Sequence, residues 1–519
     1  MVKRPLSSYV LDDRFLSLMA FILIFAMAAR TPLDSDMWWH LRAGEESVRQ
    51  GRPLTVDVFS STRYGERWIN HSWLSEMGMY GLFHSGGYFA LGFAVATIAT
   101  LSMAFVYLQM EGHVLLKAFI LVFASIVASL VWSPRPQLIS LLFFGMLGYL
   151  LYLFKWKKRD YLWSLPVIFL FWSNLHGGYV LGLLLIGALI AGEIFDRIQG
   201  KLGPEAISLR DILRIGLWAG ASILVVVINP NGLAMWGIPF RTVGVGVLRE
   251  FISEWASPDF HEITQQPMLW LLMLTIITLA LSKLPVNGYE LFSFCGFAYL
   301  AFVARRNYGP FAMVTAPILA RHLNRVLTDW WVNAKPAISP YFTGKLFEKL
   351  NAGGRSEPPL HWRVLINSAV LLLFSSAAIA KLAIVTSPNL VSTYAKTFYP
   401  AEAVEWIERN RPPREIFNEY NWGGYLIWNL RQYPVFVDGR TDLYHDTFLR
   451  SYLEVMSGDG EWESILQDYS INLILLGNKS QLGQELLEHP GWTRVYHDSF
   501  ADVFERQNAI QGSLKTDRP

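Results

Sequence analysis

Long apolar segments alternate with short polar ones through the first three quarters of the chain. Eleven of these segments approach the roughly 20 residues that a helix needs to cross a membrane. They lie near residues 15–33, 85–109, 114–132, 137–154, 161–174, 179–195, 213–229, 267–283, 289–304, 308–322 and 364–385. The pattern predicts a polytopic α-helical membrane protein with about 11 transmembrane helices. Several segments are short or contain proline, so the count holds to within one or two.

The pattern changes after residue 386. Apolar residues recur at helical spacing in residues 401–409, 463–469 and 481–488, and strand-like runs occupy 434–437, 471–476, 492–496 and 501–504. This predicts an α/β soluble domain at residues 387–507, following a transmembrane domain at 1–386 with long outer loops at 34–84 and 229–266. Residues 508–519 are predicted to form a disordered tail.

Basic residues predict the orientation. Lysine and arginine concentrate in residues 155–159, 196–214 and 321–363, which all face the same side if the N-terminus is cytoplasmic, as the positive-inside rule requires. The C-terminal domain is then extracytoplasmic. The first apolar segment has no signal-peptidase site, so we interpret it as a retained helix. We expect an integral protein of the plasma (inner) membrane.

Composition supports this class. Hydrophobic residues make up 52% of the chain and charged residues 17%, against about 25% charged residues in soluble proteins. The single cysteine, Cys295, excludes an intrachain disulfide. The bilayer is the expected partner, and the sequence indicates no nucleic acid partner.

The first outer loop begins with an unusual polar motif. It contains Asp34, Asp36, Trp38, Trp39, His40 and Arg42. Carboxylates at membrane depth are functional candidates, and such a pair can divide the roles of base and ionised partner or hold a divalent cation. An aspartate pair also occurs as an ordinary loop cap. The two tryptophans favour an interfacial anchor, and a face for a sugar or isoprenoid is the alternative.

Further polar residues fall later in the same outer loop and in the other predicted outer loops. They are His71, Glu76, Arg135, His176, Arg305 and Arg306. Outward arginines run against the positive-inside rule, and their guanidinium forks suit a lipid phosphate. Interfacial snorkelling is the alternative. The glycine-containing runs at 421–425 and 437–442 are interpreted as turn chemistry.

These motifs together resemble the integral-membrane glycosyltransferases of the GT-C fold class. The resemblance rests on the runs at 34–40, 70–76, 422–425 and 438–440, and it is similar to a prokaryotic subgroup with D-x-D-x-W-W-H in the first outer loop. The Trp-Trp-Asp-Tyr-Gly signature of oligosaccharyltransferases is absent, which counts against asparagine-linked transfer.

The resemblance implies a function. A polyprenyl-phosphate-linked sugar would be the donor, a lipid, glycan or protein hydroxyl the acceptor, and transfer of a hexose or pentose would invert the anomeric centre. Asp34 would be the general base, and Asp36 would bind the acceptor or a divalent cation, Mg²⁺ or Mn²⁺, the one cofactor expected. His40, His71, Arg135 and Arg305 would be the candidates for the leaving phosphate. Glu76, His176, Arg306, Arg42, Trp38 and Trp39 complete the predicted substrate site.

A non-catalytic function is the alternative. The chain would then be a membrane scaffold, a lipid-binding protein or a transporter that displays the outer α/β domain. A transporter places ionisable groups near the middle of the membrane. In this sequence they crowd the predicted outer boundary, which favours chemistry on a lipid-linked substrate at the membrane surface.

Overall fold

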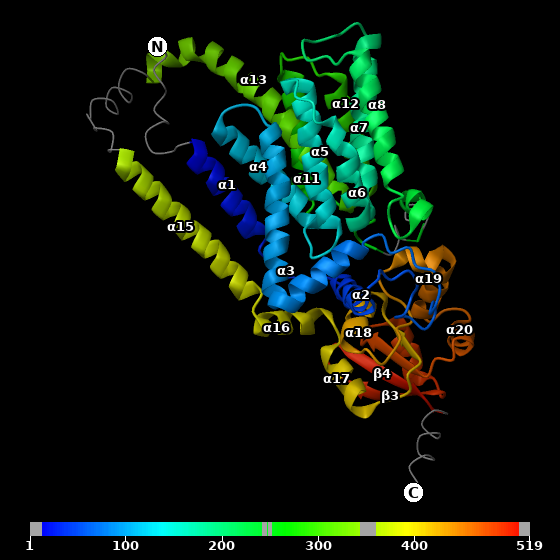
Figure 1. The fold of residues 1–519 in the computed structure, drawn as a ribbon. Coiled ribbons are helices and arrows are strands. Elements are labelled where there is room, and N and C mark those ends of the chain that lie inside the picture. The colour runs from blue at the N-terminus through cyan, green and yellow to red at the C-terminus, as the bar shows by residue number, and fades with distance from the viewer. Residues whose placement is uncertain (1–12, 241–245, 248–251, 343–359, 508–519) are drawn as a thin grey trace.

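The structure is a computed structural model that describes residues 13–240, 246–247, 252–342 and 360–507. A bundle of long helices carries a smaller α/β unit at one end (Figure 1). The predicted tail at 508–519 and parts of the predicted outer loop at 229–266 lie outside the described residues.

Each of the eleven predicted apolar segments contains a helix. In chain order these are α1 (Asp13–Ala28), α3 (Trp73–Gln109), α4 (Val114–Ala128), α5 (Gln137–Lys157), α6 (Leu165–Leu175), α7 (Val180–Ile198), α8 (Leu209–Val225), α11 (Gln266–Leu281), α12 (Gly288–Val303), α13 (Tyr308–Phe342) and α15 (Leu360–Val385). Among the described residues, 5 helices are long and apolar enough to cross a membrane on their own. The count of about 11 spans therefore stays a prediction.

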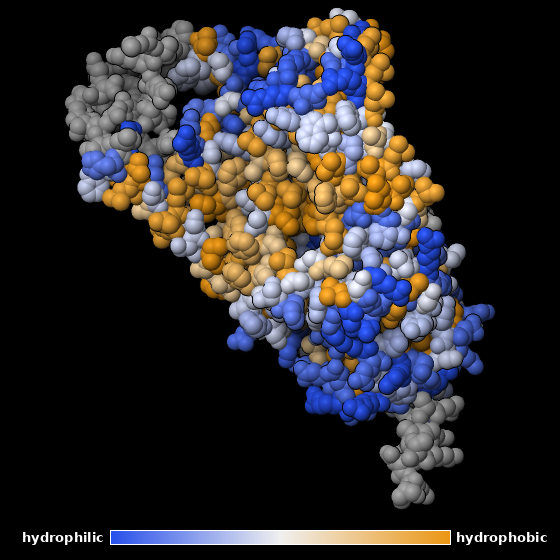
Figure 2. Space-filling view, viewed as in Figure 1, coloured by the Kyte–Doolittle hydropathy of each residue, from blue (hydrophilic) through white to orange (hydrophobic). Residues whose placement is uncertain are grey.

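The surface of the helical bundle indicates whether water or a membrane surrounds it. A hydrophobic belt covers its middle, and hydrophilic surface covers the two ends (Figure 2). Leu217 of α8 is 74% exposed and Leu372 of α15 is 68% exposed. Apolar surface this continuous is not stable against water, and it is what a bilayer requires. The chain is an integral membrane protein.

The first outer loop folds back as helix α2 (Met37–Gln50), which ends at Gly51 in the left-handed conformation, φ 66°. Helix α3 is kinked at Gly86 and Gly87, so its first part packs along α2 before the chain enters the bundle (Figure 1). Helix α3 begins at Trp73. Trp68, which precedes it, is buried, with 2% exposure, in the second hydrophobic core described below.

The C-terminal unit begins with two helices and continues as a mixed sheet with four further helices. Its helices are α16 (Pro388–Phe398), α17 (Ala401–Asn410), α18 (Gly423–Asn429), α19 (Thr441–Ser457), α20 (Trp462–Asp468) and α21 (Gln481–Glu488), and its strands are β1 (Ile416–Asn418), β2 (Leu473–Gly477), β3 (Trp492–His497) and β4 (Ala501–Arg506). The strand order is β1-β2-β4-β3. β1 is parallel to β2, and the other two pairings are antiparallel.

One predicted strand is wrong. Residues 435–437 of this segment are buried, but the segment does not join the sheet. The side chain of Asn418 pairs with their backbone instead, accepting from the Phe436 N–H at 2.8 Å and donating to the Val437 carbonyl at 2.9 Å. The backbone of Ser61 donates to the Val435 carbonyl at 2.9 Å. This segment therefore fastens the C-terminal unit to the first outer loop.

Two hydrophobic cores result. The first fills the helical bundle. The second is built from the C-terminal unit together with α2 and residues of the first outer loop, including Trp38, Leu41 and Phe59. A boundary in sequence at residue 386 therefore does not separate the cores, because the aspartate-containing loop packs as part of the C-terminal unit.

Candidate active site

Arg135 is the centre of a charged cluster where the bundle meets the C-terminal unit. It lies between Pro134 and Pro136, immediately before α5. Its Nε is 2.5 Å from Asp34 Oδ1, and its Nη1 is 2.9 Å from Asp36 Oδ2 and 3.1 Å from Glu254 Oε2. Three carboxylates from two distant loops thus converge on one guanidinium, as the sequence predicted for Asp34, Asp36 and Arg135.

The two aspartates share one turn but have different surroundings. Asp34 Oδ1 accepts a hydrogen bond from the backbone N–H of Asp36 at 2.9 Å, the geometry of an Asx turn. Burial, against the opposing charge of Arg135 and together with the charges of Asp34 and Glu254, raises the pKa of Asp36 to about 7. A carboxyl group with such a pKa changes its protonation near neutral pH.

Two histidines lie beside this cluster. The rings of His71 and His176 are 5.6 Å apart. Burial lowers the pKa of each, so both are neutral at pH 7. The Nδ1 of His176 accepts a hydrogen bond from the Gly178 N–H at 3.0 Å, which places the proton on its Nε2. The Nδ1 of His71 is buried and has no hydrogen-bond partner among the described residues.

Arg305 and Arg306, which are adjacent in the sequence, have different surroundings in the structure. Arg306 lies over the ring of Trp255, with its Cζ 4.2 Å from the centroid, and is 3.8 Å from Glu254. Burial lowers the pKa of Arg306, and Arg135 lowers it further, although Glu254 and Asp36 oppose this. Arg305 faces away toward Ser257 and Glu262. Only Arg306 belongs to the cluster around Arg135.

The tryptophan pair does not form the predicted interfacial anchor. Trp38 is 2% and Trp39 7% exposed, and Trp38 packs edge-on against Tyr399 and Tyr425 of the C-terminal unit. Trp39 lies beside Asp36. Both indoles are therefore packed inside protein, because the C-terminal unit covers the face that the sequence alone would assign to lipid.

Three other predicted binding residues are held within the scaffold. His40 and Glu76 are buried and bonded to each other, 3.0 Å from Nδ1 to Oε1, and Asn70 donates to the second oxygen of Glu76 at 2.6 Å. This network ties α2 to α3. Arg42 pairs with Glu45 at 2.7 Å on the other side of α2. Burial and, after it, the charges of Arg135, His71 and His176 lower the pKa of His40, so this ring lies near the charged cluster although its bond to Glu76 holds it in the scaffold.

The C-terminal unit completes the site, which sequence reasoning missed. Gly439 packs directly on Asp36, so that a Cβ at this position would lie 1.9 Å from Asp36 Oδ1. Arg440 is 1% exposed and bridges Asp438 at 2.6 Å and Asp57 of the first outer loop at 2.5 Å. Asp442 lies close enough to His71 for each to affect the pKa of the other.

These contacts correct the interpretation of the glycine-containing runs as turns. Gly439 does not have a positive φ, and neither do Gly423 and Gly424. The three glycines permit close approach instead. A Cβ at Gly424 would lie 2.2 Å from the Ser35 carbonyl oxygen. Only residues without a side chain allow the C-terminal unit to approach the aspartate loop so closely.

The divalent cation predicted at Asp36 stays a prediction. Among the described residues, no three His, Cys, Asp or Glu side chains are arranged so that they could hold a metal ion. Asp34, Asp36 and Glu254 surround the guanidinium of Arg135, which balances their charge where a metal ion would. The roles proposed below therefore use no metal.

Comparison with solved structures identifies the fold. The oligosaccharyltransferase of Archaeoglobus fulgidus, tethered to an acceptor peptide through a disulfide bond, is similar with a TM-score of 0.55 at 12% identity, over 91% of this chain and 70% of that one. Its apo form gives a TM-score of 0.55 at 11% identity, over 89% and 69%. A mycobacterial arabinofuranosyltransferase, AftD, has a TM-score of 0.48 at 13% identity, over 96% of this chain and 40% of that one.

No family model matches the sequence. No curated protein matches it either. At this level of identity the similarity concerns the fold. The chain is a polytopic membrane protein with the GT-C fold of integral-membrane glycosyltransferases, as the sequence motifs predicted.

Proposed function

We propose that this protein is a GT-C glycosyltransferase that moves a sugar from a polyprenyl-phosphate donor to a hydroxyl acceptor on a lipid, glycan or protein. The observation that carries the proposal is the convergence of Asp34 and Asp36 on Arg135 beneath the C-terminal unit. The fold supports it, because the oligosaccharyltransferase with the same fold was solved with an acceptor peptide tethered to it.

In the proposed reaction, the two aspartates act on the acceptor, and other residues bind the leaving phosphate. The acceptor oxygen attacks the anomeric carbon and its proton passes to Asp34, the general base. The bond between that carbon and the phosphate oxygen breaks on the opposite face, so the configuration inverts. The electron pair leaves with the polyprenyl phosphate. Asp36, bonded to the same guanidinium as Asp34, orients the acceptor hydroxyl.

Arg306 and the two histidines receive the leaving phosphate. Arg306 is 3.8 Å from its one carboxylate neighbour and makes no side-chain hydrogen bond within the described ranges, so its donors are available for a phosphate oxygen. The Nε2–H of His176 is a second donor. Neutral histidines donate hydrogen bonds at pH 7 without an added cost of burying charge.

Asp36 is the alternative candidate for the general base. Its pKa of about 7 lies near the value that favours proton transfer at neutral pH. The two assignments predict different pH profiles. If Asp36 is the base, the acid limb of kcat against pH, centred near pH 7, disappears in Asp36→Asn. If Asp34 is the base, Asp36→Asn retains an acid limb.

An assay of membranes that contain the full chain tests the function. A panel of polyprenyl-phosphate sugars is offered, and transfer of labelled sugar to endogenous acceptors is measured. Asp34→Asn should abolish transfer with unchanged protein level. Glu66→Gln changes an exposed carboxylate of the same outer loop, 47% exposed, and should retain activity. Unchanged transfer in Asp34→Asn contradicts the assigned base.

The non-catalytic alternative predicts a different result in the same assay. A scaffold, lipid-binding protein or transporter transfers no sugar with any donor of the panel, and Asp34→Asn then has no effect to measure. We also propose that the C-terminal unit is extracytoplasmic in the plasma membrane, with the N-terminus cytoplasmic. In a Cys295→Ser background, a single cysteine introduced at Glu66 should react with a membrane-impermeant maleimide in intact cells, and exclusion of the reagent contradicts this orientation.

A further inference from the structure

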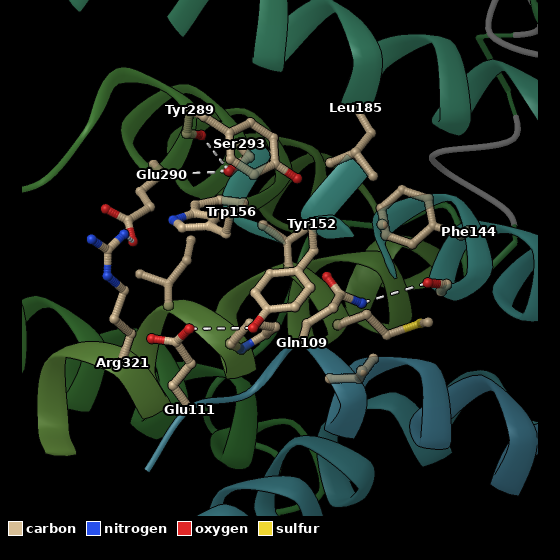
Figure 3. Close-up of a pocket in the computed structure, with 17 residues that line it drawn as sticks. Gln109, Glu111, Phe144, Tyr152, Trp156, Leu185, Tyr289, Glu290, Ser293 and Arg321 are labelled. Carbon is tan, nitrogen blue, oxygen red and sulfur yellow. Dashed lines mark hydrogen bonds and ion pairs between the residues drawn. The ribbon is translucent and has the colours of Figure 1, made fainter. Parts of the chain in front are cut away.

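A second site lies at the opposite end of the helical bundle from Asp34. There α3, α5, α7, α12 and α13 enclose a cavity of about 50 Å³ (Figure 3). Helix α5 starts next to Arg135 and reaches the cavity at Tyr152 and Trp156. Seventeen residues of helix span about 25 Å, so the chemistry proposed at Asp34 does not account for this cavity.

The lining has an apolar side and a polar side. In Figure 3, Phe144 and Leu185 lie on one side, and Glu111, Trp156, Glu290 and Arg321 lie on the other. Met313, Val314 and Ile318 add to the apolar lining. A cavity of this kind suits the head group of an amphiphile, held among the polar side chains with its first alkyl carbons against the apolar wall.

Each charged side chain on the polar side already has an ion-pair partner. Arg321 donates to Glu290 at 3.0 Å and to Glu205 at 2.7 Å. Glu290 also accepts the backbone N–H of Asn287 at 3.1 Å in the cap of α12. Lys157 is 3.3 Å from Glu111. An anionic or cationic head group would have to break one of these pairs and leave a charge uncompensated, so an uncharged head is favoured.

Two polar groups remain available on that side. The indole N–H of Trp156 is buried and has no acceptor among the described residues. Glu111 uses one oxygen, Oε1, to accept from the Tyr152 hydroxyl at 3.2 Å and from Lys157, and its side chain is 44% exposed. A hydroxyl group both accepts and donates, so it can pair with the indole and with a carboxylate.

We propose that this cavity binds the uncharged, hydroxyl-bearing head of an amphiphile, about the size of glycerol. A water molecule needs about 10–15 Å³ on this scale, so 50 Å³ admits about four such groups and is too small for a disaccharide. The rings of Tyr152 and Trp156, 5.5 Å apart, give apolar faces for the C–H groups of the head. The proposal does not depend on the transferase function.

Native mass spectrometry of the full chain tests this proposal. The protein is purified in lauryldimethylamine oxide, which has no hydroxyl head, and titrated with 1-oleoylglycerol, 1-oleoylglycerol 3-phosphate or oleylamine. We expect one saturable adduct with 1-oleoylglycerol and at least about tenfold weaker binding of the two charged amphiphiles, the ratio that corresponds to one displaced ion pair. Equal binding of all three heads overturns the proposal.

Matched variants locate the adduct. Trp156→Phe removes the indole N–H but keeps an aromatic ring and should weaken binding about tenfold. Leu185→Phe enlarges a wall residue that is 1% exposed and should abolish the adduct. The controls Trp163→Phe and Leu184→Phe change side chains that are 61% and 47% exposed. Melting curves confirm folding, and binding equal to wild type in Trp156→Phe, or an equal loss in the controls, overturns the assignment.

Discussion

Gly439→Ala is the sharpest perturbation of the proposed active site. The added methyl group would lie 1.9 Å from Asp36 Oδ1 and 3.2 Å from Trp39 Nε1. Relief of the first contact to an ordinary separation requires a movement of about 1.5 Å. The ion pair of Asp36 with Arg135 is 2.9 Å long, and a displacement of that size breaks it.

The expected effect is on turnover. A misplacement of about 1 Å in a catalytic group costs about 100-fold in rate, so kcat for sugar transfer should fall by about that factor, with a smaller change in KM for the donor. The acid limb of the pH profile should also shift, because Asp36 loses the surroundings that raise its pKa to about 7. A change in global stability alone would not move that limb.

A matched glycine provides the control. Gly296 of α12 has no atom within 4 Å of an added Cβ, so Gly296→Ala should leave transfer unchanged. Both variants are purified, their melting temperatures are compared, and transfer is measured from pH 5 to 9. Wild-type kcat and an unshifted pH profile in folded Gly439→Ala would refute the argument that the C-terminal unit positions Asp36.

Three further predictions concern other charges at the site. Arg306→Gln should lower kcat about 100-fold or more because a donor to the leaving phosphate is lost, whereas Arg305→Gln, whose side chain points elsewhere, should retain activity; equal loss in both contradicts the assignment. Asp36→Asn should raise the melting temperature above pH 7 and not below pH 4. The folded-state pKa of about 7 exceeds the ordinary value of 3.8, so Asp36 lowers stability progressively as pH rises from about 4 to about 7, by up to about 4 kcal/mol, and the loss stays constant above pH 7. A melting temperature of Asp36→Asn below that of the wild type at pH 8 contradicts this. Arg440→Ala removes the cationic partner of the buried carboxylates of Asp57 and Asp438 and should lower the free energy of unfolding by about 3–5 kcal/mol. The loss of folded protein after heating measures this, and an unchanged melting curve refutes the role of this bridge.

The apolar pattern predicted the helices well because each bilayer-facing helix must be apolar along its own length. Each predicted segment contains a helix. The same logic predicted that Asp34 and Arg135 meet, since both follow from their places at the ends of such segments. Prediction of this kind needs only local sequence and a rule for which side each loop faces.

The contacts of the C-terminal unit could not be predicted in this way. Arg440 reaches Asp57 across 383 positions of sequence, and the role of Gly439 depends on what lies opposite it. The tryptophan pair shows the same limit. The sequence pattern of paired tryptophans beside an apolar segment is the same whether lipid or protein covers the indoles. Here Tyr399 and Tyr425 cover Trp38.

The most direct test of the transferase proposal compares sugar transfer by wild type and by Asp34→Asn in the same membranes, with a polyprenyl-phosphate sugar that the wild type accepts. We predict labelled product with the wild type, none with Asp34→Asn, and equal amounts of folded protein in both. Product formation by Asp34→Asn at the wild-type rate would contradict the proposal that this carboxylate, held by Arg135 at 2.5 Å, is the base.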